Sequence, residues 1–309
     1  MVEIFLRTLP FFAIIGLGYG AARMRFFPEE ATAWLTKFIF YFALSAMIFR
    51  FAATLPFSDI FDPRLILAYL AGTLATYLIA LLVARMRGQD LATSGIEAQC
   101  AAIGNVGFLG LPMLAALFGE AAIGVVMLVL TVDLVVFSSL IVILINGSRG
   151  LGTGMATLRQ VGLGLLKNPM IVSITLGMSW SALSLPMPEP FHDFLTILGG
   201  AATPGALFAI GASLAGKSAE RLAVAGWLSF AKLIIHPVLV AIAVLFLLPV
   251  APFTAAVTIA AAALPVAGNV YMLAQHYGVA PHRVSAAILV STTLSIATLP
   301  PAIAWVSGF

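Results

Sequence analysis

The tripeptide Gly-Asn-Val occurs twice in this chain, at 104–106 and 268–270, each time inside a long apolar stretch. Residues that weaken helices lie beside both copies, since Gly107 and Pro112 follow the first and Pro265 precedes the second. Proline removes a backbone donor and glycine weakens a helix, so a helix that contains either tripeptide should break. Inside a bilayer, a break is tolerated only where protein, water or a ligand satisfies the freed backbone groups. Two broken helices in corresponding positions therefore predict a buried polar site.

The composition places the chain in a membrane. Of its 309 residues, 62% are hydrophobic and only 9% are charged, which is more apolar than a soluble domain of this size needs to be. A helix needs about 20 apolar residues to cross the hydrocarbon core of a bilayer. Runs of this kind predict an all-α membrane protein with ten transmembrane helices. The predicted spans are 4–22, 31–53, 64–84, 92–118, 121–146, 169–186, 190–215, 221–248, 252–276 and 283–306.

Lys and Arg residues predict the orientation, because they gather in the cytoplasmic loops of membrane proteins. One set of alternate loops carries Arg23, Arg25, Arg85, Arg87, Arg149, Arg159, Lys167, Lys217, Arg221 and Arg283. The opposite side carries Arg7 and Arg64, with Arg50 near its edge. We therefore predict a multi-pass protein of the cell membrane whose two termini are both extracytoplasmic. The basic, Gly-rich loop at 147–168 is then cytoplasmic, and we expect it to be a flexible linker with a short amphipathic turn.

Five spans in each half would give two homologous halves opposite orientations. The two Gly-Asn-Val copies lie 164 residues apart. Adding this offset to span 4–22 gives 168–186, and adding it to span 92–118 gives 256–282, both close to spans assigned independently. The sequence thus predicts an inverted 5+5 repeat. Its units are a first five-helix repeat at 1–146, a cytoplasmic linker at 147–168 and an inverted second repeat at 169–309.

The predicted breaks can form an anion site. The fourth span is expected to resume near Leu111 and Pro112 and the ninth near Asn269, so that each half-helix N-terminus points at the centre of the bilayer. Such an end carries unsatisfied N–H groups and roughly half a positive charge. Asn105 and Asn269 add amide groups that either contact a carboxylate or cap the breaks internally. We favour direct contact with a ligand.

Ionisable residues within spans are costly and are functional candidates by default. Lys232 either compensates the charge of a substrate or pairs with an acid or a freed carbonyl, and the sequence leaves both roles open. Asp133, near the middle of the fifth span, is a candidate for pairing with Lys232 or for coupling to a proton or Na⁺. Glu97 is a second coupling candidate, although a water-filled vestibule could solvate it, and His236 is expected to be a packed core histidine. The predicted substrate-binding residues are Asn105, Gly107, Pro112, Pro265, Asn269 and Lys232.

Several classes of function find no support in the sequence. There is no G-x-x-x-x-G-K-[ST] loop, which argues against ATP-driven transport by this chain alone. The four histidines lack metal-ligand spacing, and a single cysteine, Cys100, excludes an intrachain disulfide and a Cys-rich metal site. We predict no enzyme activity, no cofactor and no metal. The net charge of +3 comes from loop anchors and gives no reason to expect a nucleic-acid partner.

Two motifs resemble those of a known family. The segment Asn-Val-Gly-Phe-Leu-Gly-Leu-Pro at 105–112 resembles the fourth-helix motif of the auxin efflux carrier family. The segment Leu-Pro-Val-Ala-Gly-Asn-Val-Tyr-Met-Leu-Ala at 264–274 resembles its ninth-helix motif, and Lys232 with Pro237 is similar to its eighth helix. The resemblance covers the whole chain and fits the compact microbial members.

The resemblance implies a ten-helix fold shared with bile-acid sodium symporters, in which the broken fourth and ninth helices cross. Helices 1, 2, 6 and 7 would form a scaffold, and helices 3–5 and 8–10 a transport domain. Elevator-like motion and a scaffold-mediated homodimer are implied in the same way. Microbial relatives include carriers of malonate and malate, which makes dicarboxylates better candidates than auxin.

We therefore predict a secondary carrier that moves a small organic anion, a mono- or dicarboxylate that is malonate-like, malate-like or auxin-like, by an elevator-type mechanism. The alternative within transport is a proton- or sodium-coupled symporter. The alternative of another class is a membrane receptor that binds the anion without moving it. The expected partners are the organic anion, the lipid bilayer and a second copy of the chain.

Overall fold

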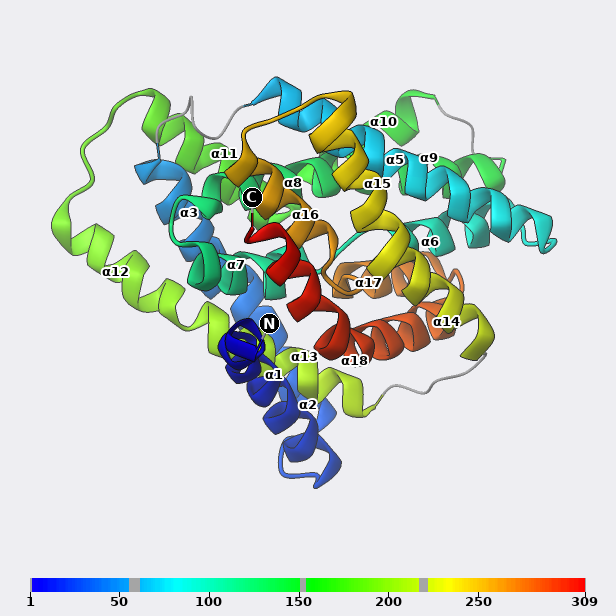
Figure 1. Ribbon diagram of the computed structural model, residues 1–309, viewed down its shortest axis with the longest axis horizontal. Helices are drawn as coiled ribbons and strands as arrows, with labels where there is room; N and C mark the ends of the chain where they lie inside the picture. Colours follow the sequence, from blue (N-terminus) through cyan, green and yellow to red (C-terminus); the bar gives the residue numbers. More distant parts are fainter. Residues whose placement is uncertain (1, 56–61, 151–153, 217–221, 309) are drawn as a thin grey trace.

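The computed structural model describes residues 2–55, 62–150, 154–216 and 222–308 (Figure 1). Every regular element within these ranges is a helix. In the same ranges, extended backbone pairs at one isolated antiparallel bridge, between Gly104 and Val266. The prediction of an all-α protein is confirmed.

The helices follow one another along the whole chain. The first part contains α1 (Val2–Arg23), α2 (Glu29–Phe38), α3 (Leu44–Thr54), α5 (Pro63–Met86), α6 (Leu91–Ala102), α7 (Leu111–Phe118), α8 (Ala122–Val132), α9 (Ser138–Ser148) and α10 (Met155–Lys167). The second part contains α11 (Pro169–Ala182), α12 (Glu189–Gly200), α13 (Ala202–Ala215), α14 (Leu222–Phe230), α15 (His236–Ile242), α16 (Pro252–Ala262), α17 (Gly268–Tyr277) and α18 (Pro281–Val306). π-Helical turns adjoin them at η1 (Ile39–Ala43), η2 (Val106–Gly110), η3 (Asp133–Phe137), η4 (Ala231–Ile235) and η5 (Ala243–Leu247).

Several helices are long and apolar enough to cross a bilayer. Within the described residues these are Phe5–Arg23, Glu29–Thr54, Pro63–Met86, Ala122–Ser148, Glu189–Ala215, Leu222–Leu247 and Pro281–Val306. They coincide with seven of the predicted spans, so the protein is a multi-pass membrane protein. The fourth and ninth predicted spans are interrupted, and the sixth corresponds to the 14-residue α11, which is bent by 71° from α10. The count of ten therefore stays a prediction.

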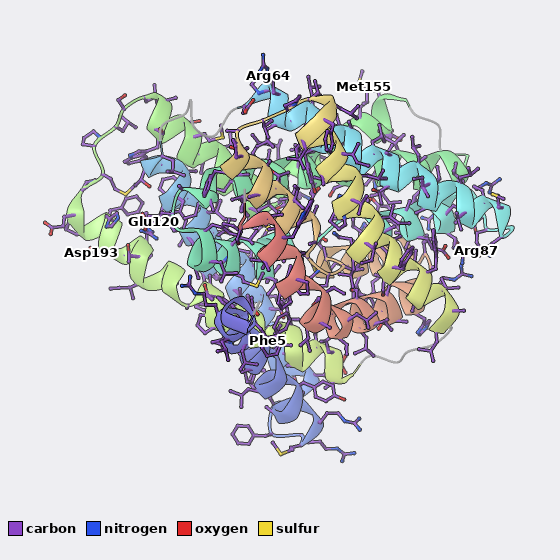
Figure 2. The ribbon with its side chains drawn as sticks, in the orientation of Figure 1. Phe5, Arg64, Arg87, Glu120, Met155 and Asp193 are labelled. Atoms are coloured by element: carbon purple, nitrogen blue, oxygen red, sulfur yellow. The ribbon has the colours of Figure 1, made fainter. Side chains whose placement is uncertain are left out.

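Side-chain caps fix where α5 and α6 begin. Asp62 accepts hydrogen bonds from the backbone of Arg64 and Leu65 at the start of α5. Asp90 accepts one from the backbone N–H of Thr93 at 2.7 Å, which starts α6 and holds the pKa of the Asp90 carboxyl below its usual range. Arg64 lies near the first end of α5 and Arg87 near its other end (Figure 2). Charged residues thus flank the apolar length of α5 at both sides.

The first break runs through 103–105, between α6 and η2. The helix resumes at Val106 and continues into α7, so the predicted restart near Leu111 and Pro112 is wrong. The π-helical turn before Pro112 supplies the reason. The Asn105 carbonyl accepts hydrogen bonds from the N–H groups of both Leu109 and Gly110, and the wider turn accommodates a proline that would otherwise interrupt the helix. The second break lies between Ala262 and Gly268, close to the position predicted.

The two breaks cross and bond to each other. The Asn105 N–H donates to the Pro265 carbonyl at 2.8 Å, and the Ala267 N–H donates to the Ile103 carbonyl at 3.1 Å. The Val266 N–H donates to the Ser291 hydroxyl of α18 at 3.1 Å. Backbone groups released by each break are therefore satisfied by protein, as an interrupted helix in a bilayer requires.

The long helices pack in two groups on either side of this crossing. α1 packs along α13, and α3 packs along α11 and α12. In the other group, α5 packs along α6 and α15, and α14 along α18 (Figure 1). The α1–α13 contact brings backbones together, because a Cβ atom on Gly211 would lie 1.8 Å from the Ile15 carbonyl oxygen. Small residues at such contacts are typical of helix packing in membranes.

A buried glutamate joins the second group at one end. Glu97 of α6 is fully buried and forms ion pairs with Arg87, after α5, and with Arg283, in the first turn of α18. Removing one member of a buried ion pair leaves the other charge without compensation. Glu97 therefore connects three chain segments that are far apart in the sequence.

We predict that Glu97→Gln lowers the free energy of unfolding by about 3 kcal/mol, because two guanidinium groups lose their carboxylate. The measurement is the unfolding temperature of the purified protein in detergent. Glu120→Gln is the matched control, since Glu120 is exposed. Equal unfolding temperatures for the two variants would show that the Glu97 ion pairs do not stabilise the fold.

Candidate functional site

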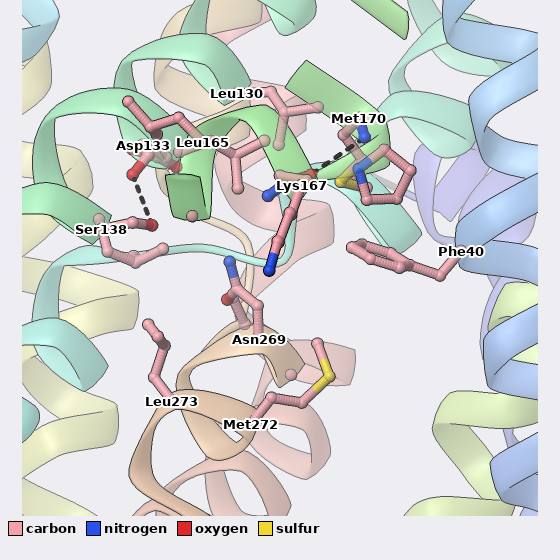
Figure 3. A pocket seen from close by; sticks show the side chains of 18 of the residues that line it. Phe40, Leu130, Asp133, Ser138, Leu165, Lys167, Met170, Asn269, Met272 and Leu273 are labelled. Atoms are coloured by element: carbon pink, nitrogen blue, oxygen red, sulfur yellow. Dashed lines mark hydrogen bonds between the residues drawn. The ribbon is translucent and has the colours of Figure 1, made fainter. Parts of the chain in front are cut away.

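A cavity of about 600 Å³ opens beside the crossing (Figure 3). Its walls come from η1, the first break, η3, α9, the linker helix α10, the start of α11 and one side of α17 along its whole length. The sequence-predicted residues that line it are Asn105, Gly107, Asp133 and Asn269. Segments from both halves of the chain therefore meet at one cavity.

The side chains of Asn105 and Asn269 are available to a ligand. Asn105 is the N-cap residue of η2, and Asn269 lies in the first turn of α17, but neither helix start has a side-chain cap hydrogen bond. The side-chain oxygen of Asn269, Oδ1, is buried without a hydrogen-bond partner among the described residues. Internal capping, the alternative that the sequence left open, is thus not how these amides are used here.

Two helix starts contribute to the same cavity. η2 begins at Val106 and α17 at Gly268, and the residues beside both starts line the cavity wall. The first N–H groups of a helix have no acceptor within the helix and carry a partial positive charge. Together with the two amides, these N–H groups can bind a carboxylate without a formally charged side chain.

Asp133 brings a carboxylate to this wall. One of its oxygens, Oδ1, accepts a hydrogen bond from the Tyr69 hydroxyl of α5 at 2.8 Å. The other, Oδ2, is buried without a hydrogen-bond partner among the described residues. The Ser138 hydroxyl, drawn with a dashed line in Figure 3, bonds the backbone carbonyl of Asp133 and leaves Oδ2 free. A buried oxygen of this kind is a suitable acceptor for a proton or a cation.

Lys232 lies apart from the cavity lining. Its side chain is fully buried, and its Nζ donates to the Ala262 carbonyl at 2.5 Å and lies 2.9 Å from Nδ1 of His236. The other ring nitrogen of His236, Nε2, lies 3.0 Å from the Thr73 hydroxyl. His236 is therefore a packed, hydrogen-bonded core histidine, as expected. These contacts favour the freed-carbonyl role of Lys232 over contact with a substrate.

The Lys232 ammonium sits where two helices end. α16 ends at Ala262, whose carbonyl it contacts, and α6 ends two residues before Gly104. A Cβ atom on Gly104 would lie 3.2 Å from Nζ of Lys232 and 3.3 Å from the Ala261 carbonyl oxygen. Glycine thus lets the first break approach both the ammonium and α16. A cation at two C-terminal helix ends opposes their partial negative charges.

The other predicted site residues lie outside the cavity lining. Pro265 acts through its carbonyl, which accepts from Asn105, and Pro112 is buried in the first turn of α7. Glu97 is held by its two arginines, so ion pairs compensate its charge in place of the water-filled vestibule that the sequence left open. Their assignments to substrate binding or coupling stay predictions.

The part that α10 plays in the cavity wall differs from the sequence-based prediction. We expected a flexible linker at 147–168, but Met155–Lys167 is a helix, and Gln160, Gly164 and Lys167 line the cavity. The signal was present in the sequence, because these residues have the i, i+4, i+7 spacing of one helix face.

Nearly the whole chain matches one family of membrane proteins. Residues 3–303 fit the family described as membrane transport protein. The chain belongs to this family. The resemblance of its two motifs to the auxin efflux carrier family is thereby confirmed, and the protein is a membrane transporter.

Relatives of this auxin efflux carrier family member cover almost its full length. It is 32% identical over 305 residues to a Rhizobium meliloti protein named "Putative malonate transporter", with 97% of this chain and 94% of the relative covered. It is 29% identical over 296 residues to a Methanothermobacter thermautotrophicus protein named "Uncharacterized transporter", with 95% of each covered.

For this family member we predict that Lys232→Gln lowers the free energy of unfolding by about 1–3 kcal/mol in the absence of ligand, because the buried Ala262 carbonyl loses its charged donor. The measurement is thermal unfolding in detergent. Lys37→Gln is the control, since Lys37 is exposed. If Lys232→Gln instead unfolds like the control and weakens binding of dianions more than monoanions, Lys232 serves the substrate.

Proposed function

We propose that the protein is a secondary carrier of a small organic anion and that its substrate is a dicarboxylate of the size of malonate. The observation that carries the proposal is a pair of asparagines, Asn105 and Asn269, that lie at two helix starts on one cavity. Neither helix start has a side-chain cap hydrogen bond. A carboxylate accepts hydrogen bonds from both amides and from free helix N–H groups. The name of the Rhizobium relative supports malonate as the first compound to test.

We further propose that the ten-helix inverted repeat underlies transport. In such a repeat, helix 1 corresponds to helix 6 and helix 2 to helix 7. The packing of α1 with α13 pairs helices 1 and 7, and the packing of α3 with α11 pairs helices 2 and 6, so the two contacts are exchanged by the repeat. This exchange supports halves at 1–146 and 169–309, joined through 147–168.

The proposed scaffold comprises helices 1, 2, 6 and 7, and the transport domain comprises helices 3–5 and 8–10. The separate packing of α1 with α13 and of α5 with α6 supports this division. Elevator-like movement of the transport domain, a homodimer through the scaffold and extracytoplasmic termini complete the proposal. They rest on the family and on the distribution of Lys and Arg.

A proton- or sodium-coupled carrier is the second candidate. Asp133 lines the cavity, and its buried Oδ2 has no hydrogen-bond partner among the described residues. A cation or a proton bound there would satisfy it. A receptor that binds the anion without transport differs from both carriers by the absence of flux.

We predict that Asn105→Ala and Asn269→Ala each weaken malonate binding about ten- to a hundredfold, because each removes a hydrogen bond to a charged group. Binding is measured as the ligand-induced rise in unfolding temperature, and transport as uptake of labelled malonate into proteoliposomes. Gln275→Ala is the control, because Gln275 lies on α17 but outside the cavity lining.

Unchanged malonate binding in both asparagine variants would disprove this site. Binding to the wild-type protein without uptake, under either direction of gradient, would identify a receptor instead of a carrier.

We predict that Asp133→Asn abolishes the response of malonate uptake to an imposed pH or Na⁺ gradient, because the amide cannot be charged. Uptake is compared in proteoliposomes with each gradient in turn. Glu97→Gln tests the other residue that the sequence offered for coupling. Because the Glu97 carboxylate is already paired with two arginines, this variant should retain the response. A wild-type response that persists in Asp133→Asn would exclude Asp133 as the coupling group.

A further inference from the structure

We propose that Lys167, at the end of the linker helix α10, contacts the second carboxylate of the substrate and makes the carrier selective for dicarboxylates. The inference rests on the proposed function, since it assigns a specificity-determining residue to the same cavity. Lys167 comes from the segment between the two halves and belongs to neither broken helix.

α10 is held over the cavity by a chain of side-chain hydrogen bonds. Asn146 of α9 donates to the Gln160 carbonyl oxygen at 2.9 Å and to the Thr157 hydroxyl at 3.3 Å. Gln160 in turn donates to the Tyr277 hydroxyl of α17 at 3.2 Å. α10 is thus attached to one helix from each half of the chain, and its position relative to Asn269 is fixed by named contacts.

One face of α10 forms cavity wall. Gln160, Val161, Gly164 and Lys167 line the cavity and lie on the same side of the helix. No heavy atom of the described part of the chain lies within 4 Å of a Cβ atom placed on Gly164, so this face leaves open space in front of it. The backbone turns by 71° directly after Lys167, where Asn168 caps α11. Because of this turn, α10 ends beside the cavity, with Lys167 as its last residue.

The Lys167 ammonium points toward the Asn269 side chain across the cavity (Figure 3). Among the described residues, its Nζ forms no hydrogen bond or ion pair. Of the Lys, Arg, Asp and Glu residues that the structure describes, Lys167 and Asp133 line the cavity. Lys232, the cation predicted from the sequence to bind substrate, does not line the cavity, and its ammonium is bonded to the Ala262 carbonyl. Lys167 is therefore the unengaged lysine of this cavity wall, to which His276 also contributes an imidazole.

The arrangement offers two positions to a dianion. One carboxylate binds between Asn105, Asn269 and the two helix starts, and the other reaches the ammonium on the opposite wall. A monoanion would use the first position only. An alternative role of Lys167, interaction with the C-terminal dipole of its own helix, would give no preference between the two ligands.

The test uses malonate and malonamate, which have similar size but carry two charges and one charge. Binding of each is measured as a shift in unfolding temperature and as inhibition of labelled malonate uptake. In the wild-type protein we expect malonate to bind about tenfold or more tightly than malonamate, because the second carboxylate gains a charge-assisted contact. Lys167→Gln should remove this preference by weakening malonate alone, and Lys167→Arg should keep it.

Arg159→Gln is the matched control, because it removes one positive charge from the exposed part of the same helix outside the cavity lining. It should leave the preference unchanged. Raising the ionic strength should reduce the wild-type preference, since the exposed ammonium is screened by salt.

Four results would overturn the inference in different ways. An unchanged preference in Lys167→Gln, or an equal loss in Arg159→Gln, refutes the role of Lys167 while leaving the proposed carrier intact. Equal wild-type affinity for malonate and malonamate refutes dicarboxylate selectivity but keeps anion binding. A wild-type protein that binds neither compound and transports neither refutes the proposed substrate class together with the inference.

Discussion

The pairing of the two breaks is the interaction on which the rest of the structure depends. Unpaired backbone groups in the hydrocarbon core cost several kcal/mol each. The hydrogen bonds from Asn105 to Pro265 and from Ala267 to Ile103 satisfy the two breaks reciprocally. Since each break supplies the partners of the other, neither interruption is tolerable alone. The sequence can therefore contain glycine and proline in two apolar segments only because those segments meet.

Helix ends of both kinds meet at the crossing. α6 and α16 end close to the Lys232 ammonium, while the residues beside the starts of η2 and α17 line the cavity. A full positive charge opposes the partial negative charges, and the partial positive charges remain available to a ligand. The site can thus attract an anion through its helix starts without committing a buried ammonium to the substrate.

The sequence predicted what depends on composition and local chemistry. The apolar runs predicted seven spans that the structure contains, and the Gly-Asn-Val copies predicted both breaks. It did not predict which way Lys232 faces, because a contact with Ala262, 30 residues away, decides that. It placed the restart of the fourth span too late, since proline propensity gave no indication of a π-helical turn before Pro112. It also read α10 as a linker, although the hydrogen bonds of Asn146 and Gln160 hold it as part of the wall.

Charge balance connects the two roles proposed for the cavity. With Lys167 and an ionised Asp133, the formal charges on the wall cancel. A dicarboxylate entering this wall would bring two uncompensated negative charges into a partly buried site, where such charges are costly. Uptake of a proton or Na⁺ by Oδ2 of Asp133 would neutralise Asp133. The Lys167 ammonium would then compensate one of the two charges of the substrate. Cation coupling and dicarboxylate selectivity would then share one electrostatic requirement, because a dianion binds well only when Asp133 is neutralised. A monoanion would need less compensation, and its binding would depend less on the cation.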